Sequence, residues 1–185
     1  LLEVSVVGPS IGEELREQSL WIIGLVSIGL MIYISLRFEW VYGAAALAAV
    51  IHDAALVLGI SALMNIEVNT AFVAAILTIL GYSINDTIVI FDRIRENLKD
   101  VDRETEGLAS INSSIQQTLM RSLHTSITTL TVIAALLFFG GSTIQSFTQV
   151  LFIGVIVGTY SSICIASPVL VKLGVLESPV QEEGA

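Results

Sequence analysis

Charged residues are scarce in this sequence. Aspartate, glutamate, lysine and arginine make up 14% of its 185 residues, whereas 54% are hydrophobic. Soluble domains carry about a quarter charged residues, so this composition is typical of an integral membrane protein. Basic residues are the scarcest, with eight lysines and arginines against 17 acidic residues. That balance argues against nucleic-acid binding, which requires a basic surface.

Cysteines and enzyme motifs are almost absent. The single cysteine, Cys164, lies within an apolar run, so no intrachain disulfide can form. The sequence contains no metal-ligand cluster, no nucleophile paired with a base, and no glycine loop suited to holding a phosphate. We therefore expect a protein that is not an enzyme and that needs no metal or cofactor. The chain begins at Leu1 without a signal-peptide pattern, and it reads as part of a longer polypeptide.

Long apolar runs, by contrast, occupy most of the chain. A bilayer core of about 30 Å requires roughly 20 apolar residues in a helix. Five runs approach or exceed that length, and we expect each to be a transmembrane helix. The predicted fold is an all-α polytopic membrane protein whose transmembrane domain covers residues 19–173. The expected spans are residues 20–36, 40–64, 70–91, 123–139 and 147–173.

Lysines and arginines lie almost entirely on one side of the five expected spans. Seven of the eight fall on that side, and Arg16 alone falls on the other. The positive-inside rule places the side rich in positive charge in the cytoplasm. The C-terminal tail, residues 174–185, is therefore expected in the cytoplasm, and residues 1–18 on the outside. The seven residues are Arg37, Arg93, Arg95, Lys99, Arg103, Arg121 and Lys172.

Two polar segments outside the spans have patterns of their own. Residues 4–7, followed by Gly8 and Pro9, predict a strand and a turn at the end of a periplasmic domain. Within residues 92–121, apolar residues recur at spacings of three and four, and this period is broken near Gly107. We expect this cytoplasmic segment to form amphipathic helices along the membrane surface. A solvated connector is the alternative.

Small residues recur at every fourth position of the last expected span. On a helix they form one smooth ridge, which allows the backbones of two helices to approach closely. We expect this ridge to serve helix packing, and it would take part in function only if it slides along its neighbour. Its residues are Gly154, Gly158, Ser162 and Ala166.

Charged residues also lie inside the expected spans or at their edges. Asp86 is roughly 8–9 Å inside the boundary at Asp92, given a rise of 1.5 Å per helical residue. Arg121 opens the next span at a similar depth, so a contact between the two side chains is geometrically reasonable. Asp53 lies near the midplane, where an isolated ionised acid costs at least ~2.5–3.5 kcal/mol on insertion scales. Each acid therefore requires a partner, water or a proton.

The pair Asp86 and Arg121 is a candidate proton relay. Movement of Arg121 toward or away from the acid would change its proton affinity, as a proton carrier requires. A static ion pair that joins two helices is the alternative, and the residues alone leave both open. Asp53 is a further candidate for the relay, with His52 as its support, although a satisfied polar contact between the two is the simpler interpretation. The polar neighbours able to support Asp86, directly or through water, are Tyr82, Ser83, Asn85 and Thr87.

A distinctive motif runs from the third span across its cytoplasmic boundary. It reads GYSINDT at residues 81–87 and FDRIREN at residues 91–97. These motifs resemble the SecF family of the bacterial SecDF protein-export machinery, which belongs to the resistance–nodulation–division (RND) superfamily. The resemblance extends from about residue 6 to residue 173. Supporting matches, in the same order along the chain, are VGPS at 7–10, RFEW at 37–40, His52–Asp53, Arg121 and FGG at 139–141.

This resemblance implies a fold and a set of site residues. The family has six spans with a periplasmic domain between the first and second, so the five spans expected here would be the second to sixth of an RND-type bundle. Asp86 matches the family's essential intramembrane aspartate, and Arg121 matches its essential arginine. Asp53 matches a recurrent acid to which the resemblance gives no defined role. The family's relay also uses an aspartate that SecD supplies.

The resemblance implies a function as well. The chain would couple proton flow to late steps of polypeptide translocation across the bacterial inner membrane, with the proton as coupling ion. It would be either a separate SecF subunit or the end of a fused SecDF chain. Two other interpretations stay open, namely an RND transporter of a lipid or hydrophobic small molecule and a purely structural membrane subunit. The implied partners are SecD, the SecYEG channel, YajC, the translocating polypeptide and membrane lipids.

Overall fold

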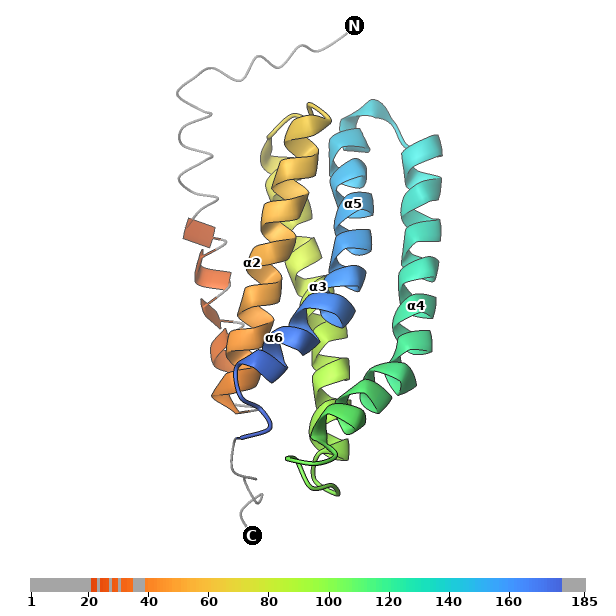
Figure 1. Cartoon of the computed structure of the whole chain (residues 1–185). Helices are drawn as coiled ribbons and strands as arrows, with labels where there is room; N and C mark the ends of the chain where they lie inside the picture. Colours follow the sequence, from red (N-terminus) through yellow and green to blue (C-terminus); the bar gives the residue numbers. More distant parts are fainter. Residues whose placement is uncertain (1–20, 23, 27, 30, 35–38, 178–185) are drawn as a thin grey trace, which may run out of the picture.

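Long helices packed side by side make up the fold. The computed structural model describes residues 21–22, 24–26, 28–29, 31–34 and 39–177, and every regular element among them is helical. Figure 1 shows α2, α3 and α5 packed together, with α4 along the outer side of α5. The elements are α2 (Trp40–Leu63), α3 (Thr70–Asn97), α4 (Gly107–Phe139), the 3-10 turn η1 (Ser142–Ile144), α5 (Gln145–Ser161), the π-helical turn η2 (Ser162–Ala166) and α6 (Ser167–Lys172).

Four helices are long and apolar enough to cross a membrane. They are α2, α3, α4 and the continuous run Ser142–Lys172, which contains α5 and α6. The all-α membrane fold is therefore confirmed, and four of the five expected spans correspond to helices that are long and apolar enough. The first expected span, residues 20–36, corresponds to a shorter apolar helix over Gly24–Ile34 that includes residues outside the described set. The count of five stays a prediction.

Both helices that flank the polar segment 92–121 extend into it. α3 continues past Phe91 to Asn97, and α4 begins at Gly107, so the connection is residues 98–106 alone. Most apolar positions of this segment are buried or half-buried against the bundle. The expected amphipathic period is thus present, but it belongs to extensions of the two spanning helices rather than to separate surface helices. Figure 1 shows the first turns of α4 inclined to the rest of the helix.

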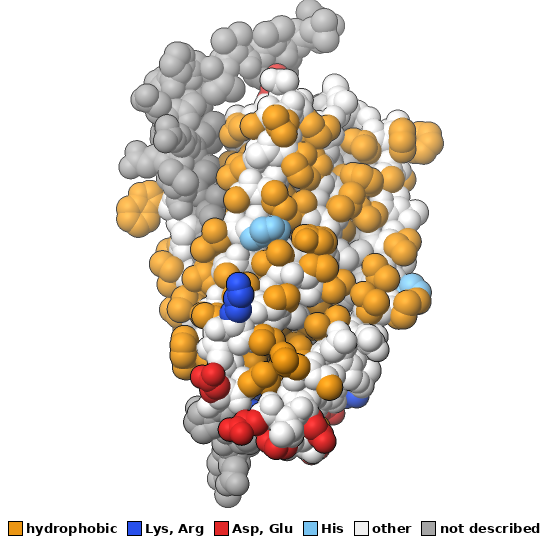
Figure 2. Space-filling model, viewed as in Figure 1, with side chains coloured by type: hydrophobic (Ala, Val, Ile, Leu, Met, Phe, Trp, Pro, Cys, Tyr) orange, Lys and Arg blue, Asp and Glu red, His pale blue; other side chains and the backbone are white. Residues whose placement is uncertain are grey.

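The two ends of the bundle differ in polarity. Figure 2 shows acidic side chains gathered at the end that carries residues 98–106, below a surface rich in hydrophobic side chains. We call this end the polar end and the opposite one the far end. At the polar end, Arg103 donates a hydrogen bond of 3.2 Å to the carbonyl oxygen of Val175, which joins the connection to the segment after α6. The expected strand at residues 4–7 and the tail beyond residue 177 lie outside the described residues.

The small-residue ridge of the last span lies against α3. A Cβ atom added at Gly154 would collide with the Ile79 side chain, and one added at Gly158 would lie 3.0 Å from the Cβ atom of Ser83. The two glycines therefore let the α5 backbone approach α3 closely, as small residues do in membrane helix pairs. The other ridge residues, also buried, are Ser162 and Ala166.

A π-helical turn interrupts the last span. This turn, η2, is followed directly by α6, which carries Pro168 at its start. Proline lacks a backbone N–H group, and its ring crowds the carbonyl four residues earlier, here that of Cys164. The wider π turn relieves this crowding without breaking the span. Such turns occur frequently at functional sites.

Candidate functional site

The intramembrane acid Asp86 lies where α3, α4 and η2 meet. Its Oδ1 atom accepts a hydrogen bond of 2.6 Å from Ser122 of α4, and its Oδ2 atom accepts one of 2.7 Å from Ser162 of η2. Asp86 is half-buried, whereas both serines are almost completely buried. Each carboxylate oxygen therefore has its own hydroxyl donor, and the two donors come from different helices.

A second set of polar contacts lies one turn of α3 nearer the far end. The Tyr82 hydroxyl donates to Ser126 Oγ of α4 at 3.3 Å. Ser126 Oγ lies 2.6 Å from Thr159 Oγ1 of α5, and Thr159 donates to the Val155 carbonyl oxygen at 2.7 Å. Two successive polar layers thus connect α3 and α4 with the last span, and Asp86 belongs to the layer nearer the polar end.

The face of α4 that is turned toward α3 carries a hydroxyl group at every fourth residue. All four hydroxyl residues are buried, with exposed fractions of 7% or less. Buried hydroxyl groups require hydrogen-bond partners, and three of these four bond side chains of α3. In the sequence, this face can be recognised by serine or threonine at every fourth position. A search limited to charged residues does not detect it. We call this face the hydroxyl seam, consisting of Ser114, Thr118, Ser122 and Ser126.

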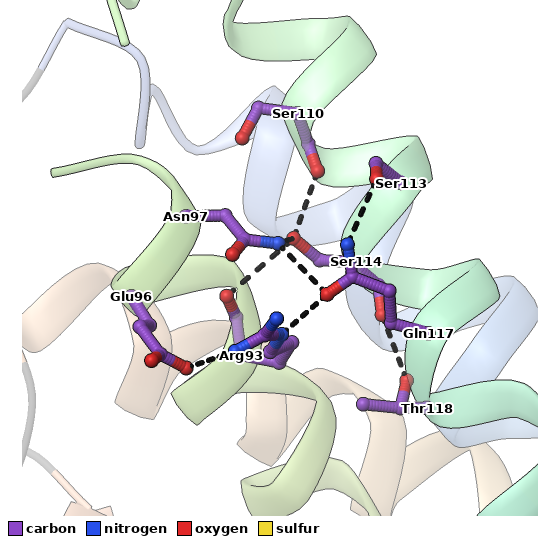
Figure 3. A network of polar contacts seen from close by, with 8 residues as sticks. All are labelled: Arg93, Glu96, Asn97, Ser110, Ser113, Ser114, Gln117 and Thr118. Carbon is purple, nitrogen blue, oxygen red and sulfur yellow. Dashed lines mark hydrogen bonds and ion pairs between the residues drawn. The ribbon is translucent and has the colours of Figure 1, made fainter. Parts of the chain in front are cut away.

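At the polar end, the seam joins a network of charged and amide groups (Figure 3). Asn97 Nδ2 donates to Ser114 Oγ at 2.8 Å. Arg93 donates from Nε to Gln117 Oε1 and from Nη1 to Glu96 Oε2, both at 2.5 Å. These contacts tie the last turns of α3 to the first part of α4, so they fix the seam beside α3.

Arg121 is exposed and does not contact Asp86. Neither residue forms an ion pair with the other, and among the described residues Arg121 makes no ion pair at all. Successive side chains on a helix point about 100° apart. Because Ser122 of α4 points toward Asp86, the neighbouring Arg121 points away from it. The contact expected from the sequence is therefore absent. Arg121 instead borders an open groove of about 350 Å³, whose other polar lining residues are Tyr33, Asp92, Arg93, Glu96 and Thr118.

Asp53 is fully buried and has two partners. Its Oδ2 atom accepts a hydrogen bond of 2.5 Å from Ser83 of α3, and its Oδ1 atom lies 3.2 Å from His52 Nδ1. The contact with His52 expected from the sequence is present. The bond from Ser83 adds a link between α2 and α3, and Gly158 of α5 packs directly on Ser83.

The other residues expected to support Asp86 lie elsewhere. Asn85 is exposed and Thr87 is buried, and the described hydrogen bonds of Asp86 involve neither of them. Tyr82 and Ser83 bond the partners given above. The donors to Asp86 thus come from other helices, because residues one to three positions away on α3 point in other directions. Within the described part of the chain, no group of three His, Cys, Asp or Glu side chains could hold a metal ion.

Comparison with known proteins identifies a family. The model of the family described as "Protein export membrane protein SecD/SecF, C-terminal" matches residues 1–175. Protein translocase subunit SecF of Sebaldella termitidis is 45% identical over 99% of this chain, and SecF of Pseudomonas aeruginosa is 45% identical over 94%. Protein translocase subunit SecDF of Thermus thermophilus is 48% identical over 92% of the chain. This chain spans 59%, 56% and 23% of these three proteins, respectively.

A solved structure has the same helix arrangement. A crystal structure of Thermus thermophilus SecDF, described as a translocon-associated membrane protein, matches with a TM-score of 0.81 and 48% sequence identity. The match covers 90% of this chain and 23% of the SecDF chain. The spanning helices described above therefore have the fold of the corresponding membrane region of SecDF.

Proposed function

The chain belongs to the SecD/SecF C-terminal family of protein-export membrane proteins, and we propose that it is the membrane domain of a SecF-type translocase subunit. The similarity to SecF and SecDF proteins supports this assignment. In it, the chain works with SecD, the SecYEG channel and YajC on a translocating polypeptide. The bilayer is the bacterial inner membrane, and the positive-inside rule assigns the polar end and the C-terminus to the cytoplasm.

Asp86 carries protons through this domain. The observation that supports this role is the pairing of each carboxylate oxygen with a hydroxyl group from a different helix. An ionised carboxylate only accepts hydrogen bonds, whereas a protonated one also donates. A proton bound on the side of either serine would meet a group that now donates, so that contact would reverse or lengthen and the packing of α4 or η2 against α3 would change. Proton movement is coupled in this way to helix movement and to late steps of export.

Arg121 acts toward a group outside this chain. Its exposed guanidinium lies at the edge of a membrane span, where a charge requires water or an opposite charge. The aspartate that SecD contributes in the family's relay supplies that opposite charge. Asp53, buried and already bonded to Ser83 and His52, has a secondary part in this function.

Proton flux into proteoliposomes that contain SecD, SecYEG and the full-length SecF protein tests this function. Asp86→Asn preserves the size of the side chain but cannot carry a proton, so we expect it to abolish proton flux and proton-driven export. Asp100→Asn, which changes an exposed acid at the polar end, is the matched control and should behave as wild type. Wild-type flux and export in the Asp86→Asn variant would overturn the proton-carrying role.

The same proteoliposomes and variants distinguish the proposed function from two alternative functions. A transporter of a lipid or another hydrophobic small molecule would not co-purify with SecD or SecYEG. A purely structural subunit would co-purify with both, yet its Asp86→Asn variant would still support export. Loss of export together with retained co-purification supports the proposed function alone.

A further inference from the structure

The hydroxyl seam and the groove meet one turn of α4 away from Asp86. Thr118 belongs to both, since it is a buried member of the seam and it lines the groove beside Arg121. The next member of the seam, Ser122, donates to Asp86 Oδ1. Four residues of helix rise about 6 Å, so a single turn separates the groove from the residue bonded to the acid.

Ser122 differs from the two seam members nearer the polar end, Ser114 and Thr118. A hydroxyl on a helix often donates to the carbonyl oxygen four residues earlier, and both Ser114 and Thr118 do so. Among the described contacts, the hydroxyl of Ser122 donates to Asp86 instead. Its oxygen atom still has a lone pair able to accept a hydrogen bond from water. Ser122 is itself only 1% exposed and does not line the groove, so a water molecule would reach its oxygen past Thr118.

The groove suits water better than lipid. Four of its lining residues are charged, namely Asp92, Arg93, Glu96 and Arg121, and its volume of about 350 Å³ is open to the outside of the chain. A water molecule needs about 30 Å³ and two to four polar partners, so several fit. Ser162 donates a hydrogen bond to the other carboxylate oxygen of Asp86, Oδ2, so Oδ1 is the oxygen that the seam contacts.

We propose that Ser122 relays protons between Asp86 and the groove, which is the cytoplasmic end of the route. This relay rests on the proposed function of Asp86. In the release step, the O–H bond of the protonated carboxyl breaks and its proton bonds to Ser122 Oγ. At the same time, the proton that Ser122 carried passes to a water molecule that enters from the groove past Thr118, and this water becomes hydronium. The product has the contact that the structure describes, with Ser122 donating to Asp86 Oδ1.

Removal of single hydroxyl groups in the complete translocase tests the relay. Ser122→Ala should lower proton flux about 100-fold, the lower end of the contribution of a positioned proton-transfer group. Ser122→Thr keeps the hydroxyl and should retain most of the flux. Ser161→Ala is the matched control, because Ser161 is equally buried but its hydroxyl has no partner among the described residues, so flux should be unchanged. Co-purification with SecD verifies that each variant assembles.

Cysteine labelling tests the groove independently of flux. The cysteine of this sequence is first replaced by Cys164→Ala, and any cysteines in the rest of the full-length protein and in SecD are replaced likewise. In inside-out vesicles, a membrane-impermeant thiol reagent should label Thr118→Cys, which borders the groove, faster than Ser126→Cys, two turns deeper in the seam. Equal labelling of the two variants, or labelling of Thr118→Cys only in right-side-out vesicles, would overturn the assignment of the groove as the cytoplasmic exit.

The Asp86→Asn variant separates the relay from the function on which it rests. Wild-type flux in Asp86→Asn would overturn the proposed function itself. Loss of flux in Asp86→Asn, with wild-type flux in Ser122→Ala, would overturn only the relay. Equal loss in Ser122→Ala and Ser122→Thr would also overturn it, because the position would then require serine for packing rather than a hydroxyl for proton transfer.

Discussion

Gly154→Ala tests the close packing of α5 on α3 that positions both acids. The added Cβ atom would collide with three atoms of the Ile79 side chain. Overpacking of this kind costs about 1–3 kcal/mol. Replacing glycine by alanine inside a helix stabilises the folded protein by about 1 kcal/mol, because alanine has the higher helix propensity. We therefore expect Gly154→Ala to destabilise the protein by up to about 2 kcal/mol.

Gly59→Ala is the matched control for this prediction. Gly59 lies in α2 with open space around the site of a new Cβ atom, so only the gain of about 1 kcal/mol in helix propensity applies. Thermal unfolding of the detergent-solubilised translocase should show a lower melting temperature for Gly154→Ala and an equal or higher one for Gly59→Ala. Adding Ile79→Ala to Gly154→Ala should remove the collision and recover part of the loss. Equal stabilisation by both glycine substitutions would refute the packing argument.

Three further substitutions test separate contacts. Asn69→Ala removes the side-chain cap of α3 and should cost about 0.5–2 kcal/mol in thermal unfolding, whereas Asn112→Ala on the exposed face of α4 should change little. Ser83→Ala leaves one oxygen of the buried Asp53 without its donor, and a cost of about 1–3 kcal/mol is expected; an unchanged melting temperature would contradict the importance of this bond. Pro168→Ala restores a backbone N–H group, so the π turn should relax toward α-helix and weaken the serine contact to the intramembrane acid, which reduced proton flux would reveal.

The apolar runs of the sequence predict the spanning helices because a bilayer fixes the length of helix that must be apolar. Hydropathy marks where a helix leaves hydrocarbon, not where the helix ends. It therefore places the end of the third span at Phe91, although α3 continues to Asn97, and it misses the polar first turns of α4, which begins at Gly107. Those extensions depend on packing at the polar end, where Ile94 and Leu98 are fully buried.

The candidate site was predictable in part. Acids stand out in apolar runs because a charge in hydrocarbon is costly, so Asp86 is evident from the sequence. Its donors are not evident, because serine is tolerated on any face of a membrane helix. Ser122 and Arg121 are adjacent in sequence, and the rotation of α4 alone decides which of them faces the acid. That rotation results from contacts between helices, and no local pattern encodes it.

One surface of the last span contacts the surroundings of both intramembrane acids. Gly158 packs on Ser83, which donates to Asp53, and one turn later Ser162 donates to Asp86. A shift of this span along α3 would therefore change the hydrogen bonds of both carboxylates together. Protonation of Asp86 at Oδ1, as proposed, would leave the Ser162 contact at Oδ2 as the link between the acid and this span. If Asp86 takes up protons as proposed, this single helix surface would carry the effect of uptake to the surroundings of the buried acid of α2.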